Sequence, residues 1–323
     1  MKKNLKLIFL VGSALSLIVA YFILDSMLFD GVRAQAIQED GMVANYFALE
    51  GTADQTAVVL LGGGQWGDYW AQEFASREMV GLSLPYTGWE GLPTLPENID
   101  LAYFEKALLW LGKKAEVNAD KIVLMGASKN AELALVLGAS FPELVSGVIA
   151  YAPSSVSWSN TALPYNSDEM MASWKYKGED IPYIPMEKPK ANDSGAFDML
   201  AYWKKGLEKT AYVDSAMIEV NRINGPVLLF SGADDQVWPS VQMADMIAKR
   251  MDDFNFEYSF QNFQYENAGH LISTNPDAKT SNRNASIELN GKQYEYTFGG
   301  TDQGDYMAKQ DARSKVFDYL KKI

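Results

Sequence analysis

The sequence places one serine in a pattern that activates a hydroxyl group. Residues 126–130 read GASKN and join the apolar run 121–125 (KIVLM) to a helical pattern over residues 128–139. This resembles the nucleophile elbow G-x-S-x-G, in which a sharp strand-to-helix turn exposes a serine, with a helix N-terminus behind it that favours negative charge. We predict Ser128 as a nucleophile, although Asn130 replaces the last glycine and the serine also suits a helix N-cap.

A serine hydroxyl needs a base at neutral pH, and the chain offers one histidine, His270. It follows the aromatic run 256–265, expected to be a strand, and Gly269 precedes it. A single histidine is often an ordinary core or surface residue. Its position late in the chain, beyond the last long strand, nevertheless suits the base that takes the proton of Ser128.

The base needs a carboxylate that orients its ring, and two aspartates follow the expected strand 226–230. The spacing G-x-x-D from Gly232, with Pro239 four residues after the acid, favours Asp235. Asp234 is then expected to shape the turn. The order serine, aspartate, histidine is that of α/β-hydrolases and differs from the orders in chymotrypsin and subtilisin.

Acyl transfer also needs donors for the oxyanion. The backbone N–H of Lys129 follows the nucleophile directly. A second donor is expected from the loop at residues 62–66 (GGGQW), from either Gly64 or Gln65. A phosphate-binding turn is the other interpretation of the three glycines, but no G-x-G-x-x-G or G-K-[ST] spacing follows.

Short apolar runs alternate with helical patterns from residue 55 onward, which predicts an α/β fold with a mostly parallel sheet and helices on both faces. Residues 55–323 are the expected catalytic domain. The expected strands are 56–61, 79–84, 121–125, 145–151, 226–230 and 256–265, and the expected helices are 68–77, 101–111, 128–139, 240–251 and 311–322.

Two insertions interrupt this alternation. Residues 154–211 hold many aromatic residues and no clear strand, which is typical of a lid. Its members Trp158, Trp174, Tyr176, Tyr183 and Trp203 are candidates for an acyl pocket or for packing against the sheet, and Trp66 and Trp238 are further pocket candidates. Residues 287–298 contain Asn-Gly between two alternating runs, which predicts a hairpin that either covers the site or decorates the surface.

Residues 1–30 predict a membrane anchor or a signal segment. Three lysines precede the uncharged run 7–24, which is long enough as a helix to approach the thickness of a bilayer core. A small-x-small site at residues 34–36 allows cleavage instead, and a buried N-terminal helix is a third alternative. Residues 31–54 are expected to form a tether and a first strand. A catalytic domain outside the cytoplasm, in a bacterial-type envelope, follows from the first two interpretations.

The composition limits the other classes of function. The chain has 323 residues, a net charge of −13, no cysteine and one histidine. Nucleic acid is excluded as a partner because no basic stripe is present, and thiolate chemistry and a histidine-rich metal centre are excluded as well. We expect no metal and no organic cofactor. The oligomeric state is not indicated.

Several segments carry a resemblance to a known family. They are LPYTGWEGLPTLPENIDLAYFEKALLWL at 84–111, GASKNAELAL at 126–135, YAPSSVSW at 151–158, NGPVLLFSGADDQVWPS at 224–240, AGHLI at 268–272 and GGT at 299–301. The sequence resembles the C-terminal catalytic domain of long-chain acyl-CoA thioesterases and bile acid-CoA:amino acid N-acyltransferases. The resemblance implies a triad of Ser128, Asp235 and His270. The family's eukaryotic enzymes carry an N-terminal β-sandwich domain, for which residues 25–54 are too short.

The resemblance implies a small acyl substrate and hydrolysis of an ester or thioester. The family's amino-acid transferases use a cysteine, whereas this chain has Ser128, so water is favoured as the acceptor. Three alternatives remain: acyl transfer to an amine or alcohol, an esterase or amidase acting in the cell envelope, and a binding domain without catalysis. An exported domain would not meet cytosolic CoA, which sets the predicted location against an acyl-CoA substrate.

Overall fold

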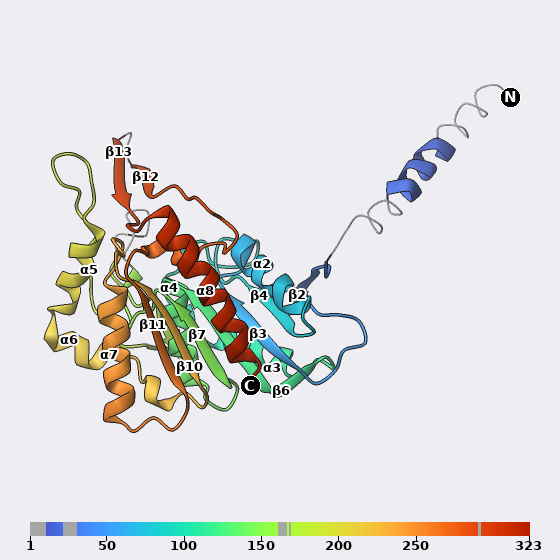
Figure 1. The fold of residues 1–323 in the computed structure, drawn as a ribbon, viewed down its shortest axis with the longest axis horizontal. Coiled ribbons are helices and arrows are strands. Elements are labelled where there is room, and N and C mark those ends of the chain that lie inside the picture. Colours follow the sequence, from blue (N-terminus) through green and yellow to red (C-terminus); the bar gives the residue numbers. More distant parts are fainter. Residues whose placement is uncertain (1–10, 22–30, 161–166, 168, 290–291) are drawn as a thin grey trace. The chain divides into compact units, whose positions relative to one another are not determined.

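The computed structural model describes residues 11–21, 31–160, 167, 169–289 and 292–323 (Figure 1). The chain divides into two compact units, residues 1–33 and 34–323. In the first unit, residues 11–21 are helical with exposed side chains, and the remainder of the predicted run 7–24 lies outside the described residues. Among the described helices, none combines the length and the apolar character that crossing a bilayer requires.

The second unit is built on an eight-stranded sheet, which confirms the predicted α/β class. Its strands run in the order β1-β2-β4-β3-β6-β7-β10-β11. The six strands from β4 to β11 are parallel, while β1 and β2 pair antiparallel at one edge. Their bounds are β1 Gln35–Glu39, β2 Met42–Phe47, β3 Gln55–Leu61, β4 Val80–Leu84, β6 Val117–Ala127, β7 Gly147–Tyr151, β10 Val227–Gly232 and β11 Phe260–Tyr265.

Helices cover both faces of this sheet. On one face, α3 (Ala102–Leu111), α4 (Lys129–Ser140) and α7 (Ser240–Asp253) contribute to the main apolar core. On the other face, α2 (Gly64–Ala75) and α8 (Asp302–Leu320) meet through the rings of Trp70, Phe74 and Phe317, and Trp70 also contacts Tyr151 of β7. The continuous apolar strands predicted from the sequence are buried because both faces are covered.

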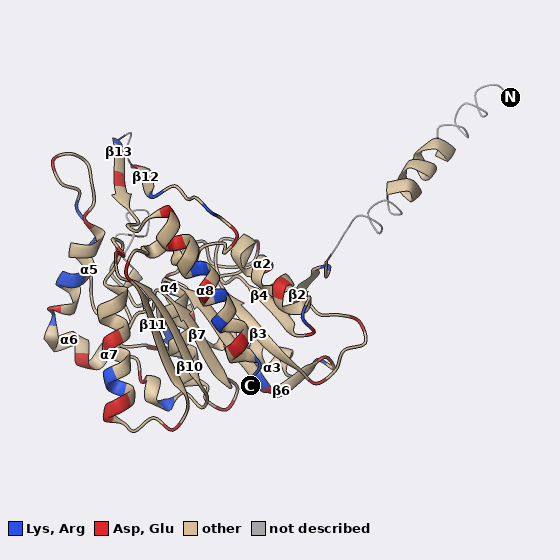
Figure 2. Cartoon of the chain, viewed as in Figure 1, with Lys and Arg blue, Asp and Glu red and all other residues tan. Residues whose placement is uncertain are grey.

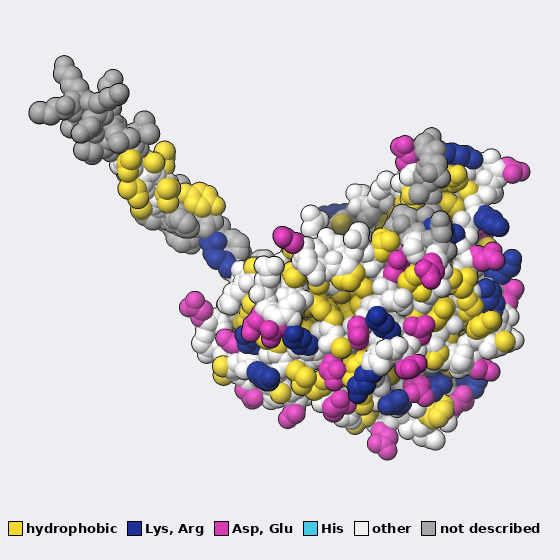
Figure 3. All heavy atoms as spheres, turned by 180° about the vertical axis from the view of Figure 1, so that it is seen from behind, with side chains coloured by type: hydrophobic (Ala, Val, Ile, Leu, Met, Phe, Trp, Pro, Cys, Tyr) yellow, Lys and Arg dark blue, Asp and Glu magenta, His cyan; other side chains and the backbone are white. Residues whose placement is uncertain are grey.

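Charged side chains lie outside this layered core. Figure 2 shows β7, β10 and the middle of β3 free of charge, whereas α7 and α8 carry both signs on their outward faces. On the face drawn in Figure 3, acidic and basic side chains are interspersed among apolar ones. The excess of carboxylates on the chain is therefore not gathered into one patch on that face.

The inserted segment after β7 forms a small subdomain with its own apolar core. It contains the short strands β8 (Trp174–Tyr176) and β9 (Glu179–Asp180), which join β5 (Ile99–Asp100), and the helices α5 (Met199–Leu207), α6 (Thr210–Ala216) and η2 (Val220–Arg222). The sequence predicted no strand in this region, because strands of two or three residues leave no periodic pattern. Trp158, Ile184, Trp203 and Val213 lie in its core with Trp238 from the sheet domain.

The predicted hairpin is confirmed in its strands, β12 (Asn284–Leu289) and β13 (Lys292–Thr297), which pair antiparallel. Its predicted Asn-Gly turn lies outside the described residues. The hairpin packs on the inserted segment, because Glu295 exchanges backbone hydrogen bonds with Gly195 and Phe197. The rings of Phe197 and Tyr294 stack at 5.3 Å.

Two strands, β1 and β2, lie within residues 31–54, where a tether and one first strand were expected. Two helices begin earlier than expected. The helix expected at 68–77 begins at Gly64, because Gly63 turns the chain with φ 56° directly after β3. The last helix begins at Asp302 rather than at residue 311, because the side chain of Thr301 caps it by accepting a hydrogen bond from the N–H of Gly304.

The contact between α2 and β4 gives a test of this packing. A Cβ atom at Gly81 would lie 2.4 Å from Cα of Ala71. We expect Gly81→Ala to lower the free energy of unfolding by about 1–3 kcal/mol, the usual cost of overpacking. Urea unfolding measures this. Gly112→Ala is the matched control, because its nearest atom would be 3.4 Å away, and an equal loss in both variants would contradict the packing.

Candidate active site

The turn between β6 and α4 presents Ser128 at the carboxyl edge of the sheet. Ser128 has φ 56° and ψ −122°, a left-handed backbone that non-glycine residues rarely adopt. Its N–H donates to the carbonyl of Tyr151 at 2.9 Å. Gly126 allows the tight return of the chain, because a Cβ there would lie 2.0 Å from the carbonyl oxygen of Asn130. The turn has the geometry that the elbow pattern predicts. Ser128 occupies the N-cap position of α4, but its side chain makes no capping hydrogen bond.

The three predicted side chains meet in a hydrogen-bonded series. Nε2 of His270 lies 2.9 Å from Oγ of Ser128, and Nδ1 of His270 lies 2.9 Å from Oδ2 of Asp235. Oδ1 of Asp235 accepts hydrogen bonds from the N–H groups of Val237 and Trp238, which fix the carboxylate. Because the carboxylate accepts from Nδ1–H, the Nε2 atom is left to accept the proton of Ser128.

The neighbouring Asp234 has the turn-shaping position expected for it. Its Oδ2 accepts from the N–H of Gly300 at 2.8 Å, and its Oδ1 accepts from the side-chain amide of Gln236 at 2.8 Å. Asp234 thus ties the turn after β10 to the segment that follows the hairpin, while Asp235 faces His270.

The loop that carries His270 is held by groups far along the chain. The N–H of His270 donates to the carbonyl of Phe298 at 2.9 Å, and the ring of Phe298 stacks on the imidazole. The N–H of Gly269 donates to Oδ1 of Asp305 at 2.8 Å. Gly299 must lack a side chain, since a Cβ there would lie 1.8 Å from the carbonyl oxygen of Asp234. The histidine is therefore positioned by α8 and the hairpin as well as by its own loop.

The predicted oxyanion donors lie at two helix N-termini. Lys129 is the first residue of α4, and Gly64 and Gln65 are the first residues of α2 rather than members of a loop. First-turn N–H groups have no acceptor within their own helix. A Cβ at Gly64 would meet no atom within 4 Å, which leaves open space beside this backbone.

Asn130, the departure from the elbow pattern, has a structural role. A Cβ at Gly62 would lie 2.3 Å from Nδ2 of Asn130, so the asparagine occupies the space left by that glycine. Its Oδ1 accepts a hydrogen bond from the hydroxyl of Tyr86 at 2.8 Å. The side chain therefore fixes the glycine turn ahead of α2 beside the elbow.

An ion pair between the half-buried Lys129 and the fully buried Glu132 lies in the first turn of α4, next to the nucleophile. Nζ of Lys129 donates to both carboxylate oxygens of Glu132, at 2.8 and 2.7 Å. Glu132 also accepts from the backbone N–H of Trp158 and the indole of Trp174, which joins α4 to the inserted segment. Burial lowers the pKa of Lys129 and raises the pKa of Glu132. A glutamate in an amphipathic helix is expected at the surface, so the sequence pattern does not indicate that Glu132 is buried.

A cavity of about 110 Å³ opens beside Ser128. Of the predicted pocket residues, Trp238 lines it, whereas Trp158 and Trp66 do not. Trp158 is fully buried behind it, with its indole N–H donating to Oγ of Ser154. The described lining residues are Pro96, Ser128, Lys129, Ser159, Asn160, Ser173, Met199, Trp203, Val237 and Trp238. Trp203 was a candidate from the lid; Met199, four residues earlier on the same helix face, was missed although i, i+4 spacing predicts that the two lie together.

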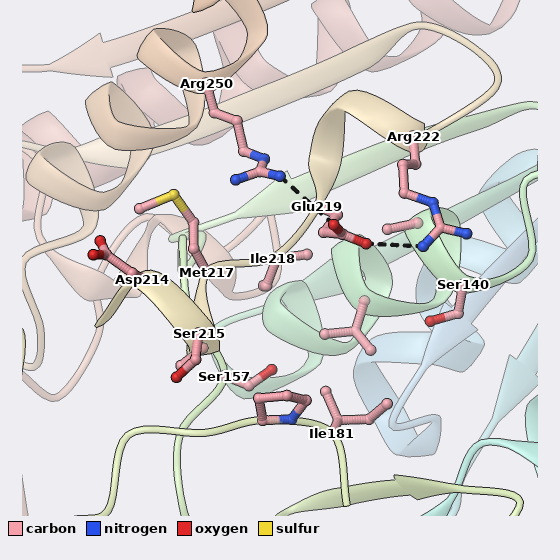
Figure 4. Close-up of a pocket in the computed structure, with 14 residues that line it drawn as sticks. Ser140, Ser157, Ile181, Asp214, Ser215, Met217, Ile218, Glu219, Arg222 and Arg250 are labelled. Atoms are coloured by element: carbon pink, nitrogen blue, oxygen red, sulfur yellow. Dashed lines mark hydrogen bonds and ion pairs between the residues drawn. The ribbon is translucent and has the colours of Figure 1, made fainter. Parts of the chain in front are cut away.

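A larger cavity, of about 380 Å³, lies between the inserted segment and α7 (Figure 4). Its described lining includes Arg222 and Arg250, which both face Glu219 (Figure 4), at 2.8 and 3.9 Å. Neither Ser128 nor His270 lines this cavity. It therefore lacks the activated hydroxyl, and the smaller cavity is the candidate reaction site.

The family follows from a comparison with known sequences. The family described as BAAT / Acyl-CoA thioester hydrolase C terminal matches residues 99–323, which is more than half of the chain. The chain belongs to this family. The predicted resemblance is confirmed, and the matched range includes Ser128, Asp235 and His270.

Mouse relatives extend the similarity. Mitochondrial acyl-coenzyme A thioesterase 2 of Mus musculus is 26% identical over 296 residues, covering 90% of this chain and 60% of the relative. Acyl-coenzyme A amino acid N-acyltransferase 2 of the same species is 25% identical over 245 residues, covering 75% and 55%. The chain therefore spans little more than half the length of these relatives.

Solved structures agree on the fold. A putative dienelactone hydrolase from Klebsiella pneumoniae superposes with a TM-score of 0.53 at 11% identity, covering 90% of this chain and 98% of the other. A dienelactone hydrolase-like promiscuous phosphotriesterase from metagenomic libraries gives 0.51 at 13% identity, with 91% and 99% covered. The predicted α/β-hydrolase fold is confirmed.

Asp305 gives a test of how the histidine loop is held. Its side chain is 2% exposed and bonds both Gly269 and Arg283, whose guanidinium lies 2.6 Å away. We expect Asp305→Ala to lower the free energy of unfolding by about 1–3 kcal/mol, because the buried N–H of Gly269 and the partly buried guanidinium of Arg283 both lose an acceptor. Urea unfolding is the measurement. Asp302→Ala is the control, since Asp302 contacts the same arginine but is 51% exposed; equal losses would contradict the assignment.

Proposed function

We propose that this protein is a serine hydrolase that cleaves an acyl ester or thioester through a covalent acyl-enzyme on Ser128. The observation that carries the proposal is the series from Oγ of Ser128 through His270 to Asp235, with both links at 2.9 Å. Membership of a family with acyl-CoA thioesterase relatives supports the same chemistry.

The reaction begins when Oγ of Ser128 attacks the acyl carbonyl carbon and Nε2 of His270 takes the hydroxyl proton. The carboxylate of Asp235 stabilises the resulting imidazolium. When the tetrahedral intermediate collapses, the bond to the sulfur or oxygen leaving group breaks, and His270 gives its proton to that group. Water then attacks the acyl-enzyme by the same route, which releases the carboxylic acid and restores Ser128.

The oxyanion of the tetrahedral intermediate accepts hydrogen bonds from backbone N–H groups. Lys129 supplies one, and Gly64 or Gln65 at the start of α2 supplies the other. Fixed donors of this kind are worth about 100- to 1,000-fold in rate each. Asn130 keeps the two donor segments together through its contact with Gly62.

Hydrolysis is the outcome we favour over acyl transfer to an amine, because serine esters are normally cleared by water. Because the chain is similar to an amino acid N-acyltransferase, amino acids are the acyl acceptors to test against water. With amino acids present, hydrolysis predicts that the free acid stays the main product. An amide as the main product would replace the proposed reaction with transfer.

Covalent labelling tests the nucleophile. We expect a fluorophosphonate to modify Ser128 in the wild-type protein, and we expect Ser128→Ala and His270→Gln to abolish the label. Loss of the nucleophile or the base costs up to about 10⁶-fold in turnover. Mass spectrometry of the labelled peptide is the readout. A label that persists in either variant would overturn the assignment.

Asp234 and Asp235 are adjacent, so matched substitutions can test which of them orients His270. We expect Asp235→Asn to lower kcat by about 10⁴-fold, because the histidine loses its orienting acceptor. Asp234→Asn preserves an oxygen acceptor in the turn and should lower kcat far less. Steady-state kinetics of the two purified variants decides between them. A larger effect of the Asp234 variant would assign the acid to Asp234.

We further propose that residues 1–30 attach the protein to a membrane or direct its export, with the catalytic domain outside the cytoplasm. The support is the uncharged run 7–24 preceded by three lysines. A site in that location meets lipid, peptide or cell-envelope acyl compounds rather than cytosolic acyl-CoA. The location therefore also bears on the leaving group.

The location is tested with a membrane-impermeant fluorophosphonate on bacterial spheroplasts that express the full chain. We expect the same extent of labelling on intact spheroplasts as in lysate, with Ser128→Ala as the unlabelled control. Labelling that requires lysis would contradict export. In that case acyl-CoA becomes an accessible substrate.

A further inference from the structure

Part of the cavity beside Ser128 is lined by large, mostly apolar side chains. Met199 and Trp203 of α5 form one side and Trp238 another, and all three side chains are almost completely buried. The indole of Trp238 contacts the ring of Trp203 at 5.7 Å and that of His270 at 5.9 Å, in both cases edge to face. These surfaces beside the catalytic imidazole are largely apolar, although the indole N–H groups of Trp203 and Trp238 are buried without a hydrogen-bond partner in the described part of the chain.

The only cation among the described lining residues is already neutralised. Lys129 holds both oxygens of Glu132, and Nζ of Lys129 also lies 3.4 Å from the carbonyl of Trp158. Whether the pair is ionised or shares its proton, it adds no net charge to the cavity. A carboxylate on the acyl group would therefore be desolvated without a free counter-charge, which is costly.

The volume limits the size of the group that fits. The cavity measures about 110 Å³. A dry protein cavity of about 150 Å³ holds benzene, with six carbons. By that proportion, about four carbons fill this cavity.

We propose that this cavity is the acyl subsite and selects short, uncharged acyl groups of about four carbons, with Met199 and Trp203 limiting their length. The inference rests on the proposed hydrolase function and adds its substrate class. The inserted segment determines this selectivity, because both limiting side chains belong to α5. Once the cavity lined by the described residues is full, we expect longer chains to gain little further buried contact.

A series of N-acetylcysteamine thioesters from acetyl to dodecanoyl tests the length limit in the full-length protein. We expect kcat/KM to rise about fourfold per methylene as the cavity fills, because each buried methylene adds about the same favourable free energy of transfer from water. We expect the rise to stop near the butanoyl ester and the longer esters to be no better. A rise that continues to the octanoyl ester or beyond would overturn the inference.

Charge selection is tested by comparing the pentanoyl and glutaryl thioesters, which have the same number of acyl carbons. We expect kcat/KM for the glutaryl ester to be at least about tenfold lower, because its carboxylate is desolvated without a free counter-charge among the described lining residues. Equal values, or a preference for glutaryl, would overturn the selection for uncharged groups.

Met199→Ala tests the role of α5, with Met186→Ala as the control. Both methionines are 4% exposed and belong to the same apolar cluster, but Met186 does not line the cavity. We expect the octanoyl-to-butanoyl ratio of kcat/KM to rise about tenfold in Met199→Ala and to stay unchanged in Met186→Ala. The ratio is independent of the folded fraction of either variant. Trp203→Phe is a milder second variant that should shift the ratio in the same direction.

Different results contradict the acyl subsite and the hydrolase function. A protein that is labelled at Ser128 but prefers long acyl chains, or whose ratio is unmoved by both α5 variants, contradicts the subsite and leaves the hydrolase standing. A folded protein that is not labelled and turns over none of these thioesters contradicts the hydrolase itself, and the subsite with it.

Discussion

The site depends on one backbone constraint, the left-handed conformation of Ser128 between β6 and α4. A non-glycine residue in such a conformation costs of the order of 1–3 kcal/mol and persists only where its surroundings enforce it. The buried strand before it, the helix after it and the bond from its N–H to Tyr151 enforce it here. As a result the hydroxyl cannot turn back to cap its own helix, and it faces His270 instead.

The base and acid are held by a second set of contacts that begins far along the chain. Gly299 and Gly300 pass so close to the loops of Asp234 and Gly269 that neither tolerates a side chain. Asp305 on α8 then fixes the N–H of Gly269 next to the histidine. The hairpin and the last helix thus act on the site although neither supplies a reacting group. The buried Glu132 of α4 joins the inserted segment to the helix that follows Ser128. The same residue therefore helps to position both the acyl pocket and the nucleophile.

Ser128, Asp235 and His270 were predictable because each follows a strand of the parallel sheet, and the carboxyl ends of parallel strands converge at one edge of the sheet. Asp235 was separable from Asp234 by spacing alone. The start of α2 could not be predicted from the sequence. Three successive glycines resemble a loop, and only the structure reveals that the helix begins at the third of them. Pocket residues were also poorly predicted: Trp158 and Trp203 look alike in sequence, yet one is core and the other lines the cavity. Which face of an irregular segment points inward is set by tertiary packing, which leaves no periodic pattern.

The central claim is that an acyl group passes through Ser128, and trapping that intermediate is its most direct test. The protein is mixed with a butanoyl thioester, quenched in acid within milliseconds, digested, and analysed by tandem mass spectrometry. We expect a mass increase of one butanoyl group on the peptide that contains Ser128, absent from Ser128→Ala. Turnover without any such adduct, or an adduct on another residue, would contradict it.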